Sequence, residues 1–271
     1  MSKMLLSDLD GTLLCDDKSI SEENKRAIAA MIEKGHYFVI ATGRPFYAAS
    51  DIVKELGLNR PGGYVLSYNG GLITDMHTGR NIYERTMDFG IVEELFKVAE
   101  KEGVYIHTYH DHKIYCMTGG EEAVHYAAVS HPVIVPTGVN ILSYLPSEPC
   151  KCLAIDLHDR QKLEYFAEKY GRIYKGVLDF FFSGPDYLEI MPHGENKGAA
   201  LKRLAAHLHV FEEDTIAVGD EENDITMIKE AALGCAMRNG LDSVKTVSDY
   251  VTENDNNHSA IAEIIDKYIL L

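Results

Sequence analysis

The sequence predicts an α/β protein whose parallel sheet is interrupted by an α+β segment. Apolar runs at residues 3–9 and 36–42 enclose a helical pattern, and helical and apolar runs alternate again from Lys197 onwards. Alternation of strands with helices is typical of a parallel sheet that carries helices on both faces. The stretch between these two regions mixes helices with strands of alternating polarity, which is typical of an α+β domain.

The first region begins as a strand–helix–strand unit. Ser21 is a suitable N-cap, the two glutamates after it favour the first helical turn, and the helix ends near Gly35. A second helix begins at Pro45, and residues 64–68 form the next strand. In such a sheet, ligands bind at the carboxyl ends of the strands.

The middle region has a different pattern of elements. We expect two helices and several alternating strands there, at residues 88–102 and 158–170 for the helices and 104–110, 151–157 and 179–191 for the strands. Gly184-Pro185 divides the last of these runs into two strands. We therefore expect residues 1–83 and 193–271 to form one domain and residues 84–192 to form an inserted domain.

The charge balance excludes some classes of function. The 271 residues include 26 Lys and Arg against 42 Asp and Glu, a formal charge of −16, which repels a nucleic-acid backbone. An anionic substrate therefore needs a local site made of a metal ion, a few cations and backbone N–H groups. No apolar run approaches the roughly 20 residues of a membrane-spanning helix, and five scattered cysteines fit a reducing compartment. We expect a cytoplasmic protein that binds neither nucleic acid nor membranes.

The segment DLDGT places Asp8 and Asp10 directly after the first apolar run. Side chains two residues apart on a strand share one face, so both carboxylates can point at one ligand. An ordinary Asp-Gly turn would also explain these residues. The position at the end of the first strand favours a ligand site instead.

A second acidic segment, GDEEND, follows the buried run at residues 215–219. It places Asp220 at a strand end and Asn223 with Asp224 at the start of the next helix, where either residue could also serve as an N-cap. Asp8, Asp10 and Asp220 together would form an oxygen-rich site suited to Mg²⁺. A cation there would offset the repulsion among the carboxylates.

Two shorter segments could bind phosphate. ATGR ends another strand with Thr42 and Gly43, and NKG opens a helix with Lys197. A threonine hydroxyl and the N–H groups after it can hold phosphate oxygens, and a lysine supplies a point charge. Each of these signals is weak when it is taken alone.

In their order along the chain, DLDGT, ATGR, NKG and GDEEND resemble the four motifs of the haloacid dehalogenase-like hydrolases. The chain is most similar to the Cof-type, or subclass IIB, sugar phosphatases of that family. The resemblance covers essentially the whole chain and implies a Rossmann-like parallel-sheet core at 1–83 and 193–271, with an α+β cap inserted at 84–192 that sets substrate specificity. It also implies a Mg²⁺-dependent phosphatase for small phosphorylated metabolites such as sugar phosphates.

The resemblance assigns roles to particular residues. It implies that Asp8 is the nucleophile, which becomes phosphorylated, and that Asp10 is the general acid and base. It implies that Mg²⁺ is bound by Asp8, the main-chain carbonyl of Asp10, and Asp220, with Asp224 supporting the metal and the lysine. The phosphate-binding positions that it implies are Thr42, Gly43, Lys197 and Asn223.

Two other functions fit the same motifs. A phosphomutase of this fold needs a second phosphate site in the cap, usually with several arginines, and residues 84–192 contain only Arg85, Arg160 and Arg172. A non-catalytic protein that binds phosphorylated metabolites would be expected to lack the nucleophile or a metal-binding acid. Because the three aspartates are all present, a phosphatase is favoured over both.

Two further segments are assigned little or no chemistry. Asn69-Gly70-Gly71 is interpreted as a hairpin or loop turn with no chemistry of its own. His107, His110 and His112 lie in one predicted hairpin of the inserted domain, where contact with substrate is favoured over a structural metal site.

Overall fold

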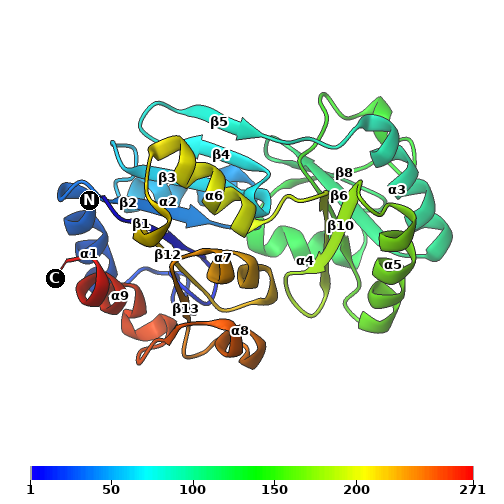
Figure 1. The fold of residues 1–271 in the computed structure, drawn as a ribbon. Helices are drawn as coiled ribbons and strands as arrows, with labels where there is room; N and C mark the ends of the chain where they lie inside the picture. The colour runs from blue at the N-terminus through cyan, green and yellow to red at the C-terminus, as the bar shows by residue number, and fades with distance from the viewer. Residues whose placement is uncertain (1, 271) are drawn as a thin grey trace. The chain divides into compact units, whose positions relative to one another are not determined.

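The computed structural model of the chain describes residues 2–270, and its Cα trace divides into two compact units (Figure 1). The core unit comprises Met1–Tyr83 and Asn196–Leu271, and the cap unit comprises Glu84–Glu195. The expected domain limits included residues 1 and 271, which lie outside the described residues. The core unit resumes at Asn196, whereas the sequence predicted residue 193.

The core unit alternates strands and helices in the predicted order. Its elements are β1 (Met4–Ser7), α1 (Glu22–Glu33), β2 (Tyr37–Ala41), α2 (Ser50–Glu55), β3 (Gly63–Ser67), β4 (Leu72–Asp75), β5 (Arg80–Glu84), α6 (Lys197–Leu208), β12 (Thr215–Gly219), α7 (Ile225–Glu230), β13 (Leu233–Ala236), α8 (Asp242–Val247), β14 (Tyr250–Val251) and α9 (Ala260–Tyr268).

The core sheet has the strand order β14-β13-β12-β1-β2-β3-β4-β5. The pairs from β14 to β3 are parallel, as predicted, but β4 pairs antiparallel with β3. The reason is the short turn at Tyr68–Gly70, because a turn of that length can join only antiparallel neighbours. The sheet is therefore mixed at one edge, and its centre is the parallel group β12-β1-β2-β3.

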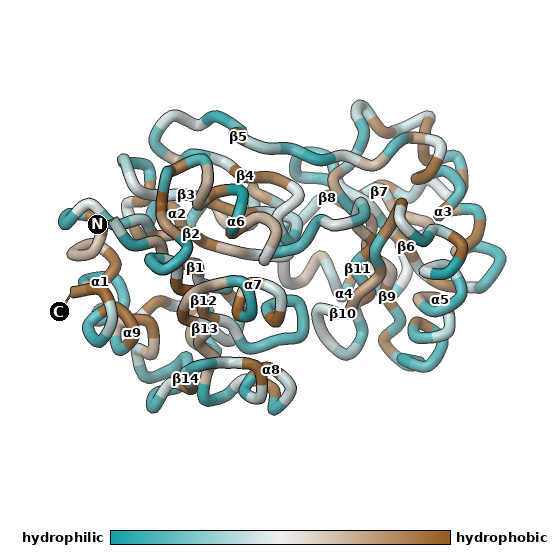
Figure 2. The backbone as a smooth tube through the Cα atoms, in the orientation of Figure 1, coloured by the Kyte–Doolittle hydropathy of each residue, from teal (hydrophilic) through white to brown (hydrophobic). Residues whose placement is uncertain are grey.

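Helices cover both faces of the core sheet because successive strand residues point to opposite sides. Leu5 of β1 packs into the cluster that contains α1 and α9, whereas Met4 and Leu6 pack into the cluster that contains α6 and α7. Figure 2 shows the hydrophobic colour along β1, β12 and β13, while β5 at the sheet edge is largely hydrophilic. The chemistry-bearing loops therefore follow strands that are buried on both faces.

The cap unit is an α+β domain with its own hydrophobic core. Its sheet has the order β10-β11-β9-β6-β7-β8, and α3 and α5 pack into the same hydrophobic cluster as its strands. The elements are α3 (Phe89–Glu102), β6 (Tyr105–His110), β7 (Lys113–Cys116), α4 (Glu121–Ser130), β8 (Val133–Pro136), β9 (Cys152–Ile155), α5 (Arg160–Ile173), β10 (Leu178–Phe182) and β11 (Tyr187–Pro192). α4 and β8 were not among the predicted elements, and β7 is the second strand of the hairpin predicted around His107, His110 and His112.

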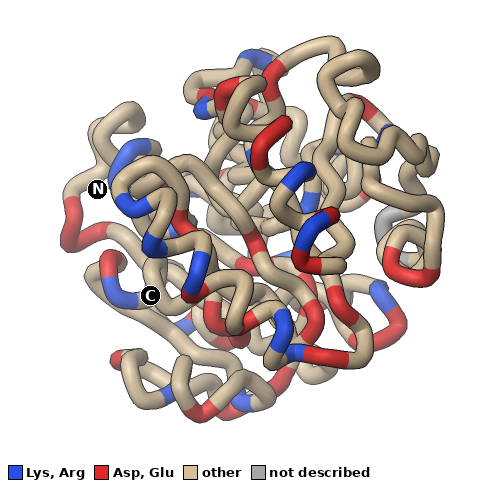
Figure 3. Tube along the Cα trace, turned by 90° about the vertical axis from the view of Figure 1, so that its right-hand side faces the viewer, with Lys and Arg blue, Asp and Glu red and all other residues tan. Residues whose placement is uncertain are grey.

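Charged residues of both signs are distributed over the chain. In the view of Figure 3, segments with Lys or Arg are interleaved with segments that contain Asp or Glu. Among residues 2–270, none of the helices has the length and apolar character needed to cross a membrane.

Candidate phosphoryl-transfer site

The candidate site lies at the carboxyl ends of adjacent core strands. β1 is flanked by β12 and β2, with Ser7 in register with both Val218 and Ile40. The N–H of Asp8 continues the ladder by donating to the carbonyl oxygen of Val218 at 3.0 Å. The loops that follow β1, β2 and β12 therefore leave the sheet at one edge, as the sequence predicted.

A buried lysine joins two of the predicted acids. Lys197, the first residue of α6, is 0% exposed, and its Nζ donates to Asp8 Oδ1 at 2.5 Å and to Asp224 Oδ1 at 2.6 Å. These partners offset the cost of burial and hold the pKa of Lys197 above its ordinary value. The residue is thus a fixed positive charge, rather than the solvated surface lysine that its sequence position alone would suggest.

Asp220 packs closely against the loop that contains the DLDGT segment. Its Oδ1 accepts a hydrogen bond from Thr12 Oγ1 at 2.7 Å, and Gly11 lies so close that a Cβ there would be 2.3 Å from Asp220 Oδ2. Gly11 also has a φ of +72°, which favours glycine. The glycine therefore allows the two acidic segments to meet.

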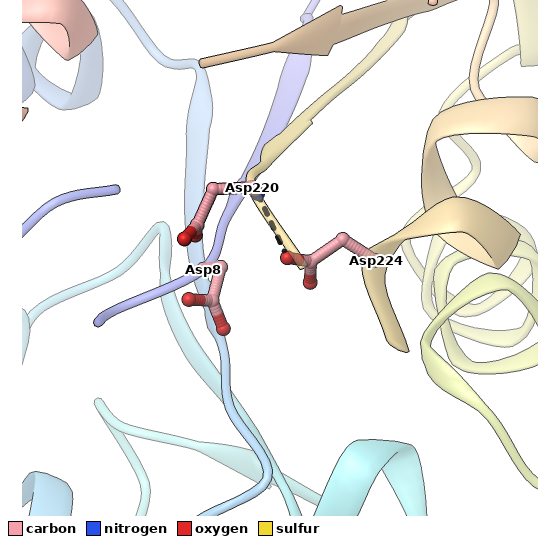
Figure 4. A group of neighbouring side chains, drawn as sticks. All are labelled: Asp8, Asp220 and Asp224. Carbon is pink, nitrogen blue, oxygen red and sulfur yellow. Dashed lines mark hydrogen bonds between the residues drawn. The ribbon is translucent and has the colours of Figure 1, made fainter. Parts of the chain in front are cut away.

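Three carboxylates gather at this point. Asp8, Asp220 and Asp224 each offer an oxygen, and these oxygens lie within 4.8 Å of one another (Figure 4). Burial, with the charges of the neighbouring acids, raises the pKa of Asp8 to about 7 and that of Asp220 to about 8. A cation would remove this penalty, because it favours the ionised carboxylates.

The carboxylate oxygens of this cluster fit Mg²⁺, and their hydrogen bonds show which aspartates are suited to bind the metal and which to support the site. Oδ1 of Asp224 already accepts from Lys197, and its Oδ2 accepts from the backbone N–H groups of Asp220 and Glu221 at 3.0 and 3.1 Å. Asp224 is therefore suited to orient the loop and the lysine, whereas Asp8 and Asp220 are the better candidates for ligands. Hard carboxylate oxygens of this kind are what Mg²⁺ prefers.

The side chain of Asp10 is held away from that cluster by two cations. Arg44 donates to it through Nε at 2.8 Å and Nη2 at 2.5 Å, and Lys18 Nζ donates at 2.8 Å. Burial opposes ionisation of Asp10, but Arg44 and Lys18 outweigh it, so the pKa of Asp10 lies below its ordinary value. In this arrangement the carboxyl group is ionised at neutral pH and has no proton to donate.

The remaining predicted residues lie around the second loop. Thr42 is 2% exposed, and its Oγ1 accepts from the N–H of Arg44 at 3.0 Å. Asn223 reaches the same region, since its Nδ2 donates to Asn69 Oδ1 at 3.0 Å. Gly43 contacts Asn69 as well, because a Cβ at Gly43 would lie 3.1 Å from that Oδ1.

Two residues of the site, Arg44 and Asn69, were not predicted from the sequence. Arg44 could have been found, because it is the cation that directly follows Thr42 and Gly43 in the ATGR segment. Asn69 was interpreted as a turn residue, and no spacing in the sequence relates it to Asn223, which lies 154 positions further on.

The cap histidines do not form one ligand group. His107 is fully buried, with its ring nitrogens 3.1 Å from the Tyr105 hydroxyl and 2.9 Å from the Tyr109 hydroxyl, and burial holds its pKa well below the ordinary value. His110 Nδ1 instead lies 3.1 Å from Ser147 Oγ. The hypothesis that His107 contacts substrate is therefore disfavoured, because its two polar atoms are already hydrogen bonded inside the cap.

Comparison with known proteins places this geometry in a family. The family model described as haloacid dehalogenase-like hydrolase matches residues 5–265. The solved structure of a haloacid dehalogenase-like hydrolase from Bacteroides thetaiotaomicron is 32% identical, with a TM-score of 0.87 over 98% of this chain and 99% of that one. The 5-amino-6-(5-phospho-D-ribitylamino)uracil phosphatase YitU of Bacillus subtilis (strain 168) is 27% identical over 284 residues, which cover 99% of this chain and 98% of YitU.

The fold likeness extends to a sugar phosphatase. The solved structure of the subclass IIB sugar phosphatase BT4131 matches with a TM-score of 0.82 over 100% of both chains, at 23% identity. These matches confirm the predicted resemblance and the predicted fold class.

Proposed function

Since this chain belongs to the haloacid dehalogenase-like hydrolases and is a phosphatase, we propose that it hydrolyses small phosphomonoesters with Mg²⁺ through an aspartyl phosphate on Asp8. Sugar phosphates and related phosphorylated metabolites are the proposed substrates, and the cytoplasm is the proposed location. No nucleic-acid partner is proposed, because a chain with a charge of −16 repels a polyphosphate.

One observation carries the proposal. The Asp8 carboxylate is fixed by a buried lysine and lies beside a second carboxylate that can share a cation with it. A carboxylate that attacks a phosphate dianion meets like-charge repulsion, and a positive environment lowers that barrier. Lys197 supplies one positive charge, and bound Mg²⁺ would supply further charge neutralisation at the phosphoryl oxygens.

The reaction then proceeds in two displacements. An Asp8 oxygen forms a bond to phosphorus while the bond from phosphorus to the ester oxygen breaks, and the leaving alkoxide takes a proton from Asp10. Asp10 next accepts a proton from water, whose oxygen attacks the acyl phosphate and releases Asp8 with inorganic phosphate. Thr42, the Gly43 N–H, Lys197 and Asn223 are the proposed ligands of the phosphoryl oxygens.

Asp10 must be released before it can act. Its carboxylate is paired with Arg44 and Lys18, and these pairs favour the ionised form. An arriving phosphate dianion offers Arg44 a competing bidentate partner. We propose that this competition frees Asp10 to take up the proton that the leaving group needs.

The test of the function is phosphate release from a panel of hexose, pentose, tetrose and cofactor phosphates. The panel includes 5-amino-6-(5-phospho-D-ribitylamino)uracil, because a relative is named for it. We expect release to fall to background in excess chelator and to return with Mg²⁺, whereas Ca²⁺, with its larger and looser coordination shell, should restore little. Full activity in chelator would contradict the metal-dependent scheme.

The thermal stability of the protein should also depend on bound Mg²⁺. Asp8 and Asp220 keep their protons in the folded state to about pH 7 and 8, while the unfolded chain loses them near pH 4. The folded state therefore binds more protons in this window, so the free energy of unfolding of the metal-free protein should fall as the pH rises through it. We expect Mg²⁺ to raise the melting temperature more at pH 8.5 than at pH 6.

The control for that experiment is Asp220→Asn, in which one of the two raised carboxyl groups is absent. This variant should lose most of the Mg²⁺-dependent stabilisation and should show a weaker decline of stability with pH. A melting temperature that responds equally to Mg²⁺ at both pH values would contradict the proposed ligands.

The cap unit is the proposed determinant of substrate choice. We expect His110→Ala and His112→Ala to change the ranking of the substrate panel more than they change hydrolysis of p-nitrophenyl phosphate, whose leaving group is small and generic. Thr42→Ala should instead lower kcat/KM for all substrates together, because it acts on the shared phosphoryl group. If the histidine variants lower kcat/KM by the same factor for every substrate, this division of roles is contradicted.

A phosphomutase remains less favoured. Two of the three cap arginines lie on α5 and are engaged there, Arg160 with Glu164 and Arg172 with Glu168. A second phosphate site would need such side chains to be available. The intact Asp8, Asp10 and Asp220 likewise disfavour a role in binding without catalysis.

A further inference from the structure

We infer that Asn69 is a positioning residue whose side chain orients the phosphate-binding amide of Asn223, from a turn that is hydrogen bonded to the loop after β2. The inference rests on the proposed phosphate-binding roles of Thr42, Gly43 and Asn223. Asn69 lies in the turn between β3 and β4, which the sequence analysis treated as a turn without chemistry.

The backbone of this turn is attached to the phosphate-binding loop. The N–H of Asn69 donates to the carbonyl oxygen of Thr42 at 3.0 Å, and the N–H of Tyr68 donates to that of Arg44 at 3.1 Å. The two hydrogen bonds bracket Gly43. The position of the loop therefore depends on the conformation of residues 68 and 69.

The side chain of Asn69 extends the same connection to the loop after β12. It is 0% exposed, and its Oδ1 accepts one N–H of the Asn223 amide at 3.0 Å. Because an amide nitrogen carries two hydrogens, this bond fixes the plane of the Asn223 amide and leaves the second N–H for another acceptor. The Asn69 amide also packs against the bare Cα of Gly43, where a Cβ would lie 3.1 Å from Oδ1.

The turn leaves one polar atom of this asparagine buried without a partner. Asn69 has a φ of +53°, and the bulky Tyr68 before it has a φ of +51°, in the left-handed region that favours glycine. Among the described residues, the buried Nδ2 of Asn69 has no hydrogen-bond partner. An Asn-Gly turn accounts for the left-handed φ of Asn69, but it does not require a buried polar atom without a partner, and such atoms concentrate at functional sites.

The experiment is a double-variant cycle with Asn69→Gly and Asn223→Ala. Glycine adopts the left-handed backbone without steric cost and removes the buried unpaired nitrogen, so the variant should fold. We expect it to raise the inhibition constant of inorganic phosphate and the KM of the preferred substrate about tenfold, which corresponds to about 1.4 kcal/mol. In the Asn223→Ala background, Asn69→Gly should raise the same two constants by less than about twofold further, because the residue through which Asn69 acts is absent.

The matched control is His209→Gly. His209 is an exposed residue at the end of α6 with a φ of +56°, so the substitution makes the same backbone change away from the loop. Its phosphate inhibition constant should equal that of the wild type. If Asn69→Gly shows no cooperative thermal transition, the cycle is run with Asn69→Ser, whose side chain is too short to reach Asn223.

The outcomes separate this inference from the proposed function. An unchanged phosphate constant in Asn69→Gly, or a full tenfold effect that persists in Asn223→Ala, overturns the positioning role while hydrolysis by the wild type stands. Absence of hydrolysis by the wild type contradicts the proposed function instead. In that case the same cycle is measured as calorimetric binding of inorganic phosphate with Mg²⁺, and non-additive losses support the role of Asn69 whereas additive or absent losses overturn it.

Discussion

Asp8→Asn lowers kcat by at least about 1,000-fold on every substrate that the wild type hydrolyses, a loss of about 4 kcal/mol in transition-state stabilisation. The reason is chemical, because an amide cannot form the acyl phosphate through which the reaction proceeds. The measurement is phosphate release under single-turnover and steady-state conditions. Near wild-type turnover in this variant would sink the assignment of the nucleophile.

The fold of the Asp8 variant should be intact. Asparagine has the size of aspartate, and Lys197 keeps its second partner, Asp224, at 2.6 Å. Because the buried Asp8 carboxyl group resists ionisation, its removal should leave the free energy of unfolding equal to or above that of the wild type at pH 8. Loss of activity with retained stability would then show that the variant lacks the nucleophile and not the fold.

Asp10→Asn is the matched variant for the second aspartate. General acid and base catalysis contributes typically ~10²–10⁴-fold, so we expect a loss in that range. The loss should be smallest for p-nitrophenyl phosphate, since its leaving group needs little protonation. In single-turnover formation of the acyl phosphate, an equal loss for good and poor leaving groups would contradict the general-acid role of Asp10.

Lys197→Met should affect activity and stability together. The substitution leaves Asp8 and the fully buried Asp224 without their shared cation, and breaking a buried pair costs about 3–5 kcal/mol. We expect a loss of that size in the free energy of unfolding from urea denaturation, and a large, uniform fall in kcat/KM across substrates. Mg²⁺ should recover part of the stability, because it neutralises Asp8, one of these two carboxylates.

Lys202→Met is the control on the same helix. Lys202 pairs with Glu230, and both side chains are about half exposed, at 57% and 42%. Exposed pairs contribute about 0–1 kcal/mol, so this variant should stay near the wild type in stability and activity. A similar effect of both substitutions would mean that α6 is simply intolerant of lysine loss.

The sequence predicted the parts of the site that follow buried strands. Asp8, Thr42 and Asp220 each come directly after an apolar run, and parallel pairing brings such positions to one sheet edge. The residue pattern placed Lys197 at a helix start, but only the family resemblance implied that Asp224 supports it. That contact depends on how α6 packs against α7, which periodicity does not specify.

Other features depended on contacts that a linear pattern does not contain. His107 is buried because both faces of β6 are covered. A histidine in an alternating run can face either solvent or a packed layer. The pairing of Asp10 with Arg44 joins two loops, and the residue spacing in neither loop predicts this contact.

The position of β1 at the centre of the core sheet has a consequence for synthesis of the chain. β1 pairs on one side with β2, but its other edge pairs with β12, where Met4 lies opposite Thr215. A ribosome that adds about 5–20 residues per second needs roughly 8–30 s between completing β3 and completing β12. During that interval the open edge of β1 has no partner, while the cap, residues 84–195, is being synthesised. The nascent core is therefore a candidate client for chaperones that shield unpaired strands, and a message truncated before residue 215 should yield an aggregation-prone product.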